Sequence, residues 1–311
     1  MIAFVLLPKL LPLRLNDLLP MSILPVGLTL LSAFFHAGWN LLARQLRDQD
    51  IFLRVPLLIS AIGIIPALIA EFTGPSIFPK VWLYIIFAGT FQGFYMWGLT
   101  QGYQSGDFTV VYPIARALPV LLIAIADILF GHAPQPIGWL GIGLVSLGCI
   151  LSPLRSLHDY SPRIYWNKTT LWIMVTAMAT VGYTILDNLA ANYRQAGLWS
   201  AVRYQVFEMC FCFISFWLIL MIFHQPTNLI GELGTWKKPA LMGLLLFSAY
   251  SLVLWAYQLS FNTSYIVALR QFSVVVGVVI AAFLFREAAP LLRISAALMI
   301  TIGVTCIAFA I

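Results

Sequence analysis

The sequence predicts an all-α, polytopic membrane protein with ten transmembrane helices in two inverted five-helix repeats. Of its 311 residues, 61% are hydrophobic and only 9% are charged, with a mean hydropathy of +0.95. A soluble domain carries about 25% charged residues, so this chain could not cover its surface in water. Apolar runs long enough to cross a bilayer recur along it, and its second half repeats its first.

The internal duplication appears as paired motifs at two spacings. The glycine of Leu147-Gly148-Cys149 recurs as that of Ile302-Gly303-Val304, about 155 residues later. Nearer the start, Ser32-Ala33 recurs as Thr176-Ala177 at a spacing of about 144. Loops of unequal length between copies of one unit would produce this slip, so we interpret the chain as two copies of one apolar unit.

A membrane span needs about 20 mostly apolar residues. Runs of this kind, bounded by charged residues or by Pro, Gly and Asn, number ten. They are Ser22–Ala43, Ile51–Ala70, Val81–Tyr103, Phe108–Phe130, Ile137–Leu151, Thr169–Tyr193, Leu198–Phe223, Pro239–Leu259, Ser264–Phe285 and Ala289–Ile311.

One charged, Pro-containing connector divides these runs into five and five. The predicted organisation is an N-terminal segment over 1–21, a first repeat over 22–152, a linker over 153–168 and a second repeat over 169–311. Translation starting at Met21 and an amphipathic segment lying on the membrane remain two interpretations of 1–21. Because five is odd, the second copy enters the membrane from the opposite side. Inverted repeats of this kind imply alternating access around a site between them.

Glycine and proline predict how the helices pack and bend. Gly89-x-x-x-Gly93, Gly98-x-x-x-Gly102 and Gly138-x-x-Gly141-x-Gly143 would let helices approach closely in lipid. Pro113 and Pro119 fall inside the fourth run and suggest a bent or broken helix there. Such breaks often lie at the binding site of a transporter, although proline is also common in ordinary membrane helices.

Ionisable groups inside a membrane cost roughly 2.5 to 3.5 kcal/mol each on insertion scales, so each one is a candidate for function. The polar residues fall on the first, fourth, sixth and ninth spans, which occupy equivalent places in the two repeats. Residues four apart share a helix face, as His36 and Asn40 do. The predicted substrate-binding residues are His36, Trp39, Asn40, Tyr112, Arg116, Tyr183, Thr184, Asp187, Arg270, Gln271 and Ser273.

This combination favours a substrate with a carboxylate or another anionic group, because arginine presents a planar fork of donors to such groups. Asp187 or His36 could carry a coupling proton. Other interpretations stay open: Arg116 and Arg270 could be structural cations, and His36 could simply hydrogen-bond across helices. Asp127 and Glu208 lie toward the ends of their spans, which predicts interface positions outside the site.

Other classes of function have no support. The chain has no Gly-x-Ser-x-Gly, His-Glu-x-x-His or Walker-type run, so we expect neither an enzyme nor an ATP-driven pump. The four cysteines lie in apolar stretches, and we expect no metal and no cofactor. The net charge of +6 is better explained by topology and lipid headgroups than by nucleic acid. By the positive-inside rule, the lysines and arginines favour an external N-terminus.

Four motifs in order carry a resemblance to a known family. They are His36-Ala37-Gly38-Trp39-Asn40, Tyr112-Pro113-Ile114-Ala115-Arg116, Tyr183-Thr184-Ile185-Leu186-Asp187 and Ala268-Leu269-Arg270-Gln271-Phe272-Ser273. With ten spans in two halves, the chain resembles the EamA-type permeases of the drug/metabolite transporter (DMT) superfamily. It departs from that family's pattern at Gln271, where the family has glutamate, and at His132, where the family has an acidic residue.

The resemblance implies a secondary active exporter or exchanger of small polar metabolites such as amino acids, driven by protons or another gradient. It also implies cytoplasmic termini, which conflicts with the charge distribution. We expect a multi-pass protein of the cell's inner membrane whose partners are a small-molecule substrate and the lipid bilayer, as a monomer or homodimer. A membrane enzyme or a passive channel using the same polar cavity is the alternative.

Overall fold

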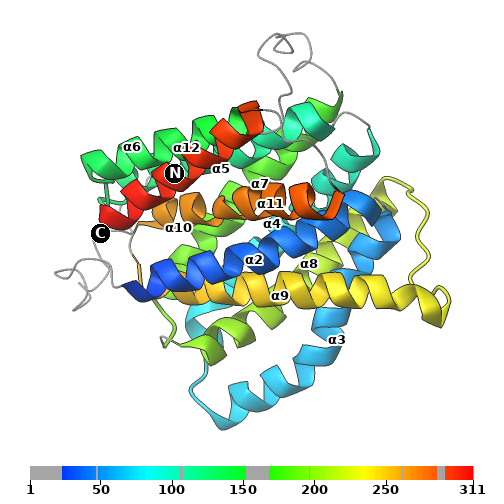
Figure 1. Cartoon of the computed structure of the whole chain (residues 1–311). Helices are drawn as coiled ribbons and strands as arrows, with labels where there is room; N and C mark the ends of the chain where they lie inside the picture. Colours follow the sequence, from blue (N-terminus) through cyan, green and yellow to red (C-terminus); the bar gives the residue numbers. More distant parts are fainter. Residues whose placement is uncertain are drawn as a thin grey trace.

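The structure is a computed structural model of the 311-residue chain. It describes residues 23–46, 48–105, 108–151, 168–195, 197–260, 262–285 and 291–310. The regular secondary structure in these ranges is helical, which confirms the predicted all-α class (Figure 1). The predicted segment 1–21 and nearly all of the linker 153–168 lie outside them.

The helices follow the predicted runs closely. The first half contains α2 (Ile23–Leu46), α3 (Gln49–Thr73), α4 (Phe78–Gln104), α5 (Phe108–Leu129) and α6 (Pro136–Leu151). The second half contains α7 (Lys168–Ala191), α8 (Leu198–Ile222), the short 3-10 turn η5 (Leu233–Trp236), α9 (Lys237–Tyr257), α10 (Thr263–Arg270), α11 (Phe272–Phe285) and α12 (Leu291–Phe309).

A helix is broken in the ninth span, whereas the fourth span, in which the prolines suggested a bent or broken helix, is continuous. Helix α5 runs without interruption across Pro119, whereas the ninth span divides into α10 and α11 at Gln271. At that point the backbone N–H of Gln271 donates to the carbonyl of Ala268 at 3.0 Å, and that of Val274 donates to Gln271 at 2.8 Å. These bonds span three residues in place of four, so the helix tightens locally to 3-10 geometry.

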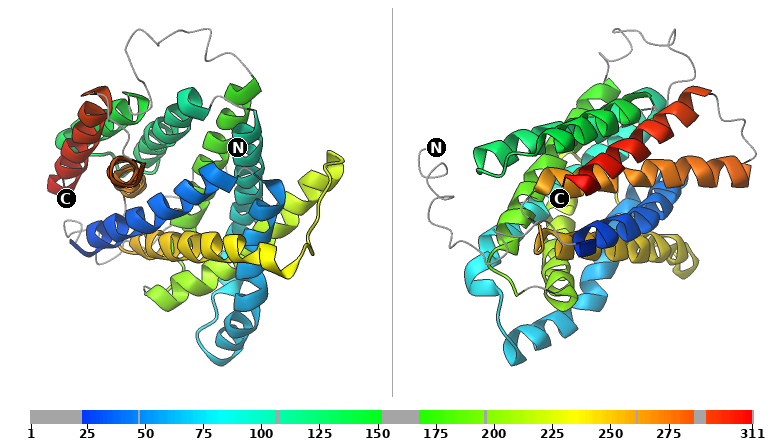
Figure 2. Two further views of the ribbon diagram at one scale, coloured as in Figure 1. Left: turned by 45° about the vertical axis from the view of Figure 1, so that its right-hand side comes forward. Right: turned by 60° about the vertical axis from the view of Figure 1, so that its left-hand side comes forward.

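The packing of the helices is the same when the two halves are exchanged. The first helix of each half packs along the third helix of the other half: α2 packs along α9, and α7 packs along α4. In the same way, the second helix of each half contacts the third helix of the other half: α3 contacts α9, and α8 contacts α4. Helix α6 packs along α12, the last helix of one half on the last of the other. Figure 1 and the two views of Figure 2 show α2 beside α9 and α6 beside α12.

Five stretches of the described part, corresponding to α2, α3, α7, α8 and η5–α9, are long and apolar enough to cross a membrane by themselves. The apolar parts of α5, α6 and α12 are shorter. Many apolar side chains face outward, among them Ile62, Phe72 and Trp199. Such exposure suits a protein whose surroundings are lipid.

Glycines bring particular helix pairs into close contact, as their spacing predicted. A Cβ added to Gly89 would lie 2.6 Å from the carbonyl oxygen of Glu208, where α4 crosses α8. At the crossing of α6 and α12, a Cβ on Gly141 would lie 2.6 Å from the carbonyl oxygen of Gly303, and one on Gly303 2.7 Å from that of Gly141. Gly143, on the other hand, has nothing within 4 Å of such an atom.

This difference predicts the effect of one methyl group on stability. Gly141→Ala should lower the melting temperature of the detergent-purified protein, because α6 and α12 must move apart, at a cost of about 1 to 3 kcal/mol. Gly143→Ala is the matched control on the same helix and should leave the melting temperature unchanged or slightly raised. Equal melting temperatures for the two variants would show that the α6–α12 contact can relax without cost.

Candidate functional site

A small cavity lies where the two halves of the chain meet. Helices α2, α4, α5, α7 and α10 contribute its walls, with about 50 Å³ of space at its centre that water can reach. Its lining is His36, Asn40, Tyr95, Gly98, Leu99, Gly102, Pro119, Ile173, Thr176, Thr180, Tyr183, Val267, Arg270 and Gln271. Ligand sites usually measure roughly 300 to 1,000 Å³, so this cavity must widen to hold a metabolite.

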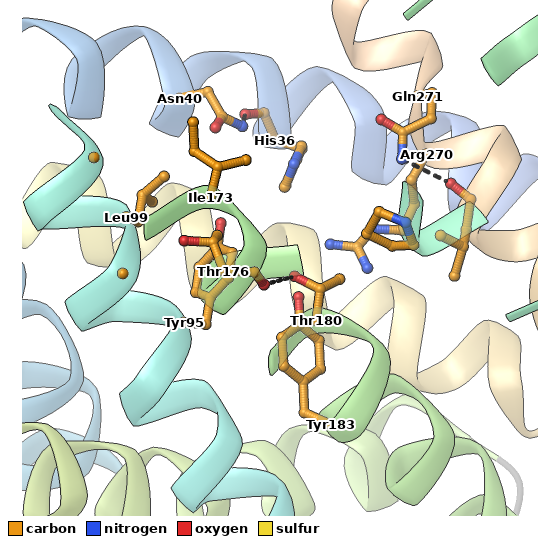
Figure 3. Close-up of a pocket in the computed structure, with 14 residues that line it drawn as sticks. His36, Asn40, Tyr95, Leu99, Ile173, Thr176, Thr180, Tyr183, Arg270 and Gln271 are labelled. Carbon is orange, nitrogen blue, oxygen red and sulfur yellow. Dashed lines mark hydrogen bonds between the residues drawn. The ribbon is translucent and has the colours of Figure 1, made fainter. Parts of the chain in front are cut away.

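Helix α2 presents His36 and Asn40 to the cavity from one face, as their spacing predicted (Figure 3). Trp39 does not line the cavity; it is buried beside His36, and its indole N–H donates to the His36 Nδ1 atom at 2.8 Å. Because Nδ1 accepts that bond, the imidazole carries its hydrogen on Nε2. Trp39 therefore sets the tautomer of His36. The Asn40 side-chain amide donates to the His36 carbonyl oxygen at 2.6 Å.

Arg270 enters the cavity at the C-terminal end of α10, beside the break in the ninth span. A helix C-terminus carries partial negative charge, which favours a cation there. The guanidinium lies 5.4 Å from the ring centroid of Tyr250, and Tyr95, Tyr183 and Tyr257 are also close. Among the described side chains no carboxylate lies within ion-pair distance of it. Arg270 is thus surrounded by tyrosines and is not paired with Asp187.

The tyrosines form a continuous aromatic wall behind the cavity. Tyr95 of α4 meets Tyr183 of α7 edge to face at 5.9 Å between centroids, and Tyr183 meets Tyr250 of α9 in the same way at 5.7 Å. Next to them, Thr180 donates its hydroxyl hydrogen to the carbonyl of Thr176 at 2.8 Å (Figure 3). A cation, an imidazole N–H, amides and aromatic faces therefore surround one small space.

The comparisons with known proteins agree with this architecture. The model of the family described as "EamA-like transporter family" matches residues 23–153. Over these residues, in its first half, the chain is similar to the EamA-like transporter family. The matched family is one of transporters, and this match together with the long apolar helices indicates a multi-pass integral membrane protein, as the sequence predicted.

A curated protein named "Riboflavin transporter", from Vibrio cholerae serotype O1 (strain ATCC 39315 / El Tor Inaba N16961), is 29% identical to this chain over 130 residues. The aligned part covers 40% of this chain and 42% of the relative, so the two match over less than half of either length. A solved structure titled "Crystal structure of protein" has a TM-score of 0.67 and 13% identity, and covers 93% of this chain and 99% of its own. That likeness extends over nearly the whole fold.

Three other predicted site residues, Asp187, Thr184 and Ser273, do not line the cavity. Asp187 is fully buried behind the tyrosines, where it accepts hydrogen bonds from the hydroxyls of Tyr204, at 2.9 Å, and Tyr250. Thr184 and Ser273 are buried within their helices and do not line the cavity. Tyr112 and Arg116 belong to α5, but their side chains lie outside the described part.

Two acidic residues that the sequence suggested for interface positions are buried. The Asp127 side chain accepts a hydrogen bond from the backbone N–H of Ser264 at 2.8 Å, so it caps the N-terminus of α10 from another helix. Glu208 is fully buried in the middle of α8, where the Gln92 side-chain amide donates to it at 2.6 Å. The position of each residue within its span did not predict these contacts, because the hydrogen-bond partners, Ser264 and Gln92, belong to other helices.

Several residues that line the cavity were not among the substrate-binding residues predicted from the sequence. Thr176 and Thr180 share a helix face with Tyr183, since they precede it by seven and three residues. Tyr95 gave no signal that separates a cavity aromatic from an interfacial one. Gly98 packs α4 on α7, because a Cβ there would lie 2.6 Å from the Thr176 Oγ1 atom, and it also lines the cavity.

Proposed function

We propose that this chain is a secondary active transporter of small polar metabolites that works by alternating access. The observation that carries the proposal is the small cavity between the two halves of the chain, to which both contribute polar side chains. The division into repeats at 22–152 and 169–311, inverted relative to each other, belongs to the same proposal. It is supported by helix packing that is unchanged when the halves are exchanged and by the odd number of spans in each half.

The lining favours a substrate with hydrogen-bond acceptors and a planar or anionic part. Arg270 supplies a fork of donors, while His36 and Gln271 bring further polar groups. Tyr95 and Tyr183 offer aromatic contacts. Amino acids carry the anionic part, and riboflavin, the substrate named for the partial relative, carries a planar ring with carbonyl acceptors. We therefore propose these two classes as the first to test.

We also propose the cell's inner membrane as its location, because spanning proteins of bacterial outer membranes are typically β-barrels and this fold is helical. A proton gradient is the proposed driving force. A homodimer or a monomer is compatible with the proposal, since the cavity is built from one chain.

Uptake into proteoliposomes tests the function. The purified protein should take up one of a panel of radiolabelled amino acids or riboflavin with saturable kinetics and concentrate it against its gradient. An excess of unlabelled substrate should compete, and liposomes without protein should show only leakage. Flux that never saturates and only equilibrates the substrate would instead indicate a passive channel.

A further inference from the structure

A buried pair of carboxyl groups lies behind the cavity. Asp187 of α7 and Glu208 of α8 are both fully buried, and their carboxyl groups are close enough to hydrogen-bond to each other once one of them carries a proton. Two carboxylates this close in a low-dielectric interior repel strongly, so they cannot both stay ionised at low cost.

The hydrogen bonds around the pair leave room for one proton. One Asp187 oxygen accepts from Tyr204 and the other from Tyr250, while Glu208 Oε1 accepts from Gln92. Glu208 Oε2 is buried and has no partner among the described residues. A hydrogen on Glu208 Oε2 that is donated to Asp187 would satisfy this remaining oxygen.

The charge of the surroundings matches a pair that holds one proton. Arg194, in the connection between α7 and α8, is buried and lies with its guanidinium carbon 4.0 Å from the Tyr204 ring centroid. It interacts electrostatically with both carboxyl groups. The positive charge of Arg194 balances a carboxyl pair that carries one negative charge. A doubly ionised pair would leave one negative charge unbalanced.

The cluster contacts the cavity through Tyr250. Its hydroxyl donates to Asp187, and its ring lies 5.4 Å from the Arg270 guanidinium carbon, which belongs to the cavity wall. The titratable or charged groups near the pair are Tyr183 on α7, Tyr204 and Cys212 on α8, Tyr250 and Tyr257 on α9, Arg194 in the loop and Arg270 on α10. An anion bound at Arg270 would therefore alter the field at the carboxyl pair through one intervening side chain.

His36 is a weaker candidate for the coupling proton. Its Nδ1 atom already accepts the Trp39 indole N–H at 2.8 Å. A doubly protonated imidazole carries hydrogen on both nitrogens and would lose that bond. A second proton on His36 would thus cost the Trp39 hydrogen bond, while the surroundings of Asp187 and Glu208 leave one position for a hydrogen.

We propose that Asp187 and Glu208 together form the proton-binding site of this transporter. In the conformation described here the pair shares one proton. When the site opens to one side, the O–H bond of the shared acid breaks, the proton passes to water on that side, and the pair becomes doubly ionised until it is reprotonated from the other side. The role of the pair in coupling transport to protons rests on the proposed transport function, but the presence of the shared proton does not.

Two transport assays test the coupling. With Glu208→Gln or Asp187→Asn, accumulation driven by an imposed pH gradient should fall at least tenfold, whereas exchange of labelled for unlabelled substrate at equal pH should continue. Glu71→Gln is the matched control. Glu71 is also a buried carboxylate that accepts backbone hydrogen bonds, but it lies in the last turn of α3, away from the cavity lining, so its variant should retain both activities.

Infrared difference spectroscopy tests the proton without any substrate. Wild-type protein at neutral pH should show the carbonyl stretch of a protonated carboxylic acid that shifts in heavy water and is absent from Glu208→Gln. Absence of that band from the wild type, or gradient-driven accumulation in both site variants, overturns the inference. A wild type that transports none of the substrates but shows the band refutes the proposed function and leaves the shared proton standing.

Discussion

Replacing Arg270 by alanine should abolish saturable transport while the protein remains folded. In the described part of the chain, Arg270 is the charged side chain that lines the cavity, and no carboxylate is paired with it. A charge-assisted hydrogen bond to a substrate is worth about 1.5 to 3 kcal/mol, which corresponds to a loss of roughly tenfold to more than a hundredfold in apparent affinity. Binding of the transported substrate, measured by calorimetry or by competition for uptake, checks this.

The control for Arg270 separates its charge from its shape. Arg270→Lys retains the positive charge but not the planar fork of donors, so it should recover part of the transport if charge dominates. The melting temperature of Arg270→Ala should stay close to that of the wild type, because no buried carboxylate loses its partner. A large drop in melting temperature together with lost transport would identify Arg270 as a structural cation.

Replacing Arg194 by methionine should destabilise the protein more than any other single change proposed here. All three guanidinium nitrogens are buried without hydrogen-bond partners among the described residues, so the side chain acts through its charge and its stacking on Tyr204. Removing it leaves the negative charge of the carboxyl pair uncompensated. Losing one member of a buried ionic group costs about 3 to 5 kcal/mol. Unfolding of the purified protein in detergent, followed by circular dichroism, measures the loss.

A second substitution should rescue this variant. In Arg194→Met combined with Asp187→Asn, the cluster carries neither the cation nor the carboxylate that needs it. The double variant should therefore be more stable than Arg194→Met alone, a coupling between neighbours that independent sites do not show. Additive losses of stability would mean that Arg194 contributes through packing and not as the counter-ion.

The helical spans and the resemblance to a transporter family could be predicted from the sequence alone. Runs of about 20 apolar residues admit few structures in lipid other than a helix, since every backbone group must be hydrogen-bonded within the segment. Spacing along one helix is equally local, which is why His36 and Asn40 were correctly expected on one face. The glycine pattern likewise indicated Gly141 as a packing residue, because a missing side chain is visible in the sequence itself.

Only the tertiary structure decided whether a polar side chain lines the cavity or is buried against other helices. Asp187 shares a helix with Tyr183, yet Tyr183 lines the cavity and Asp187 lies behind it, because the rotation of α7 against α8 and α9 places the carboxylate among their tyrosines. Glu208 became part of the same cluster through contacts between different helices, which no spacing along one helix encodes. No proline near Gln271 indicated the break in the ninth span. Side chains far apart in the chain meet only after the helices have packed, and for that reason the carboxyl pair was not visible beforehand.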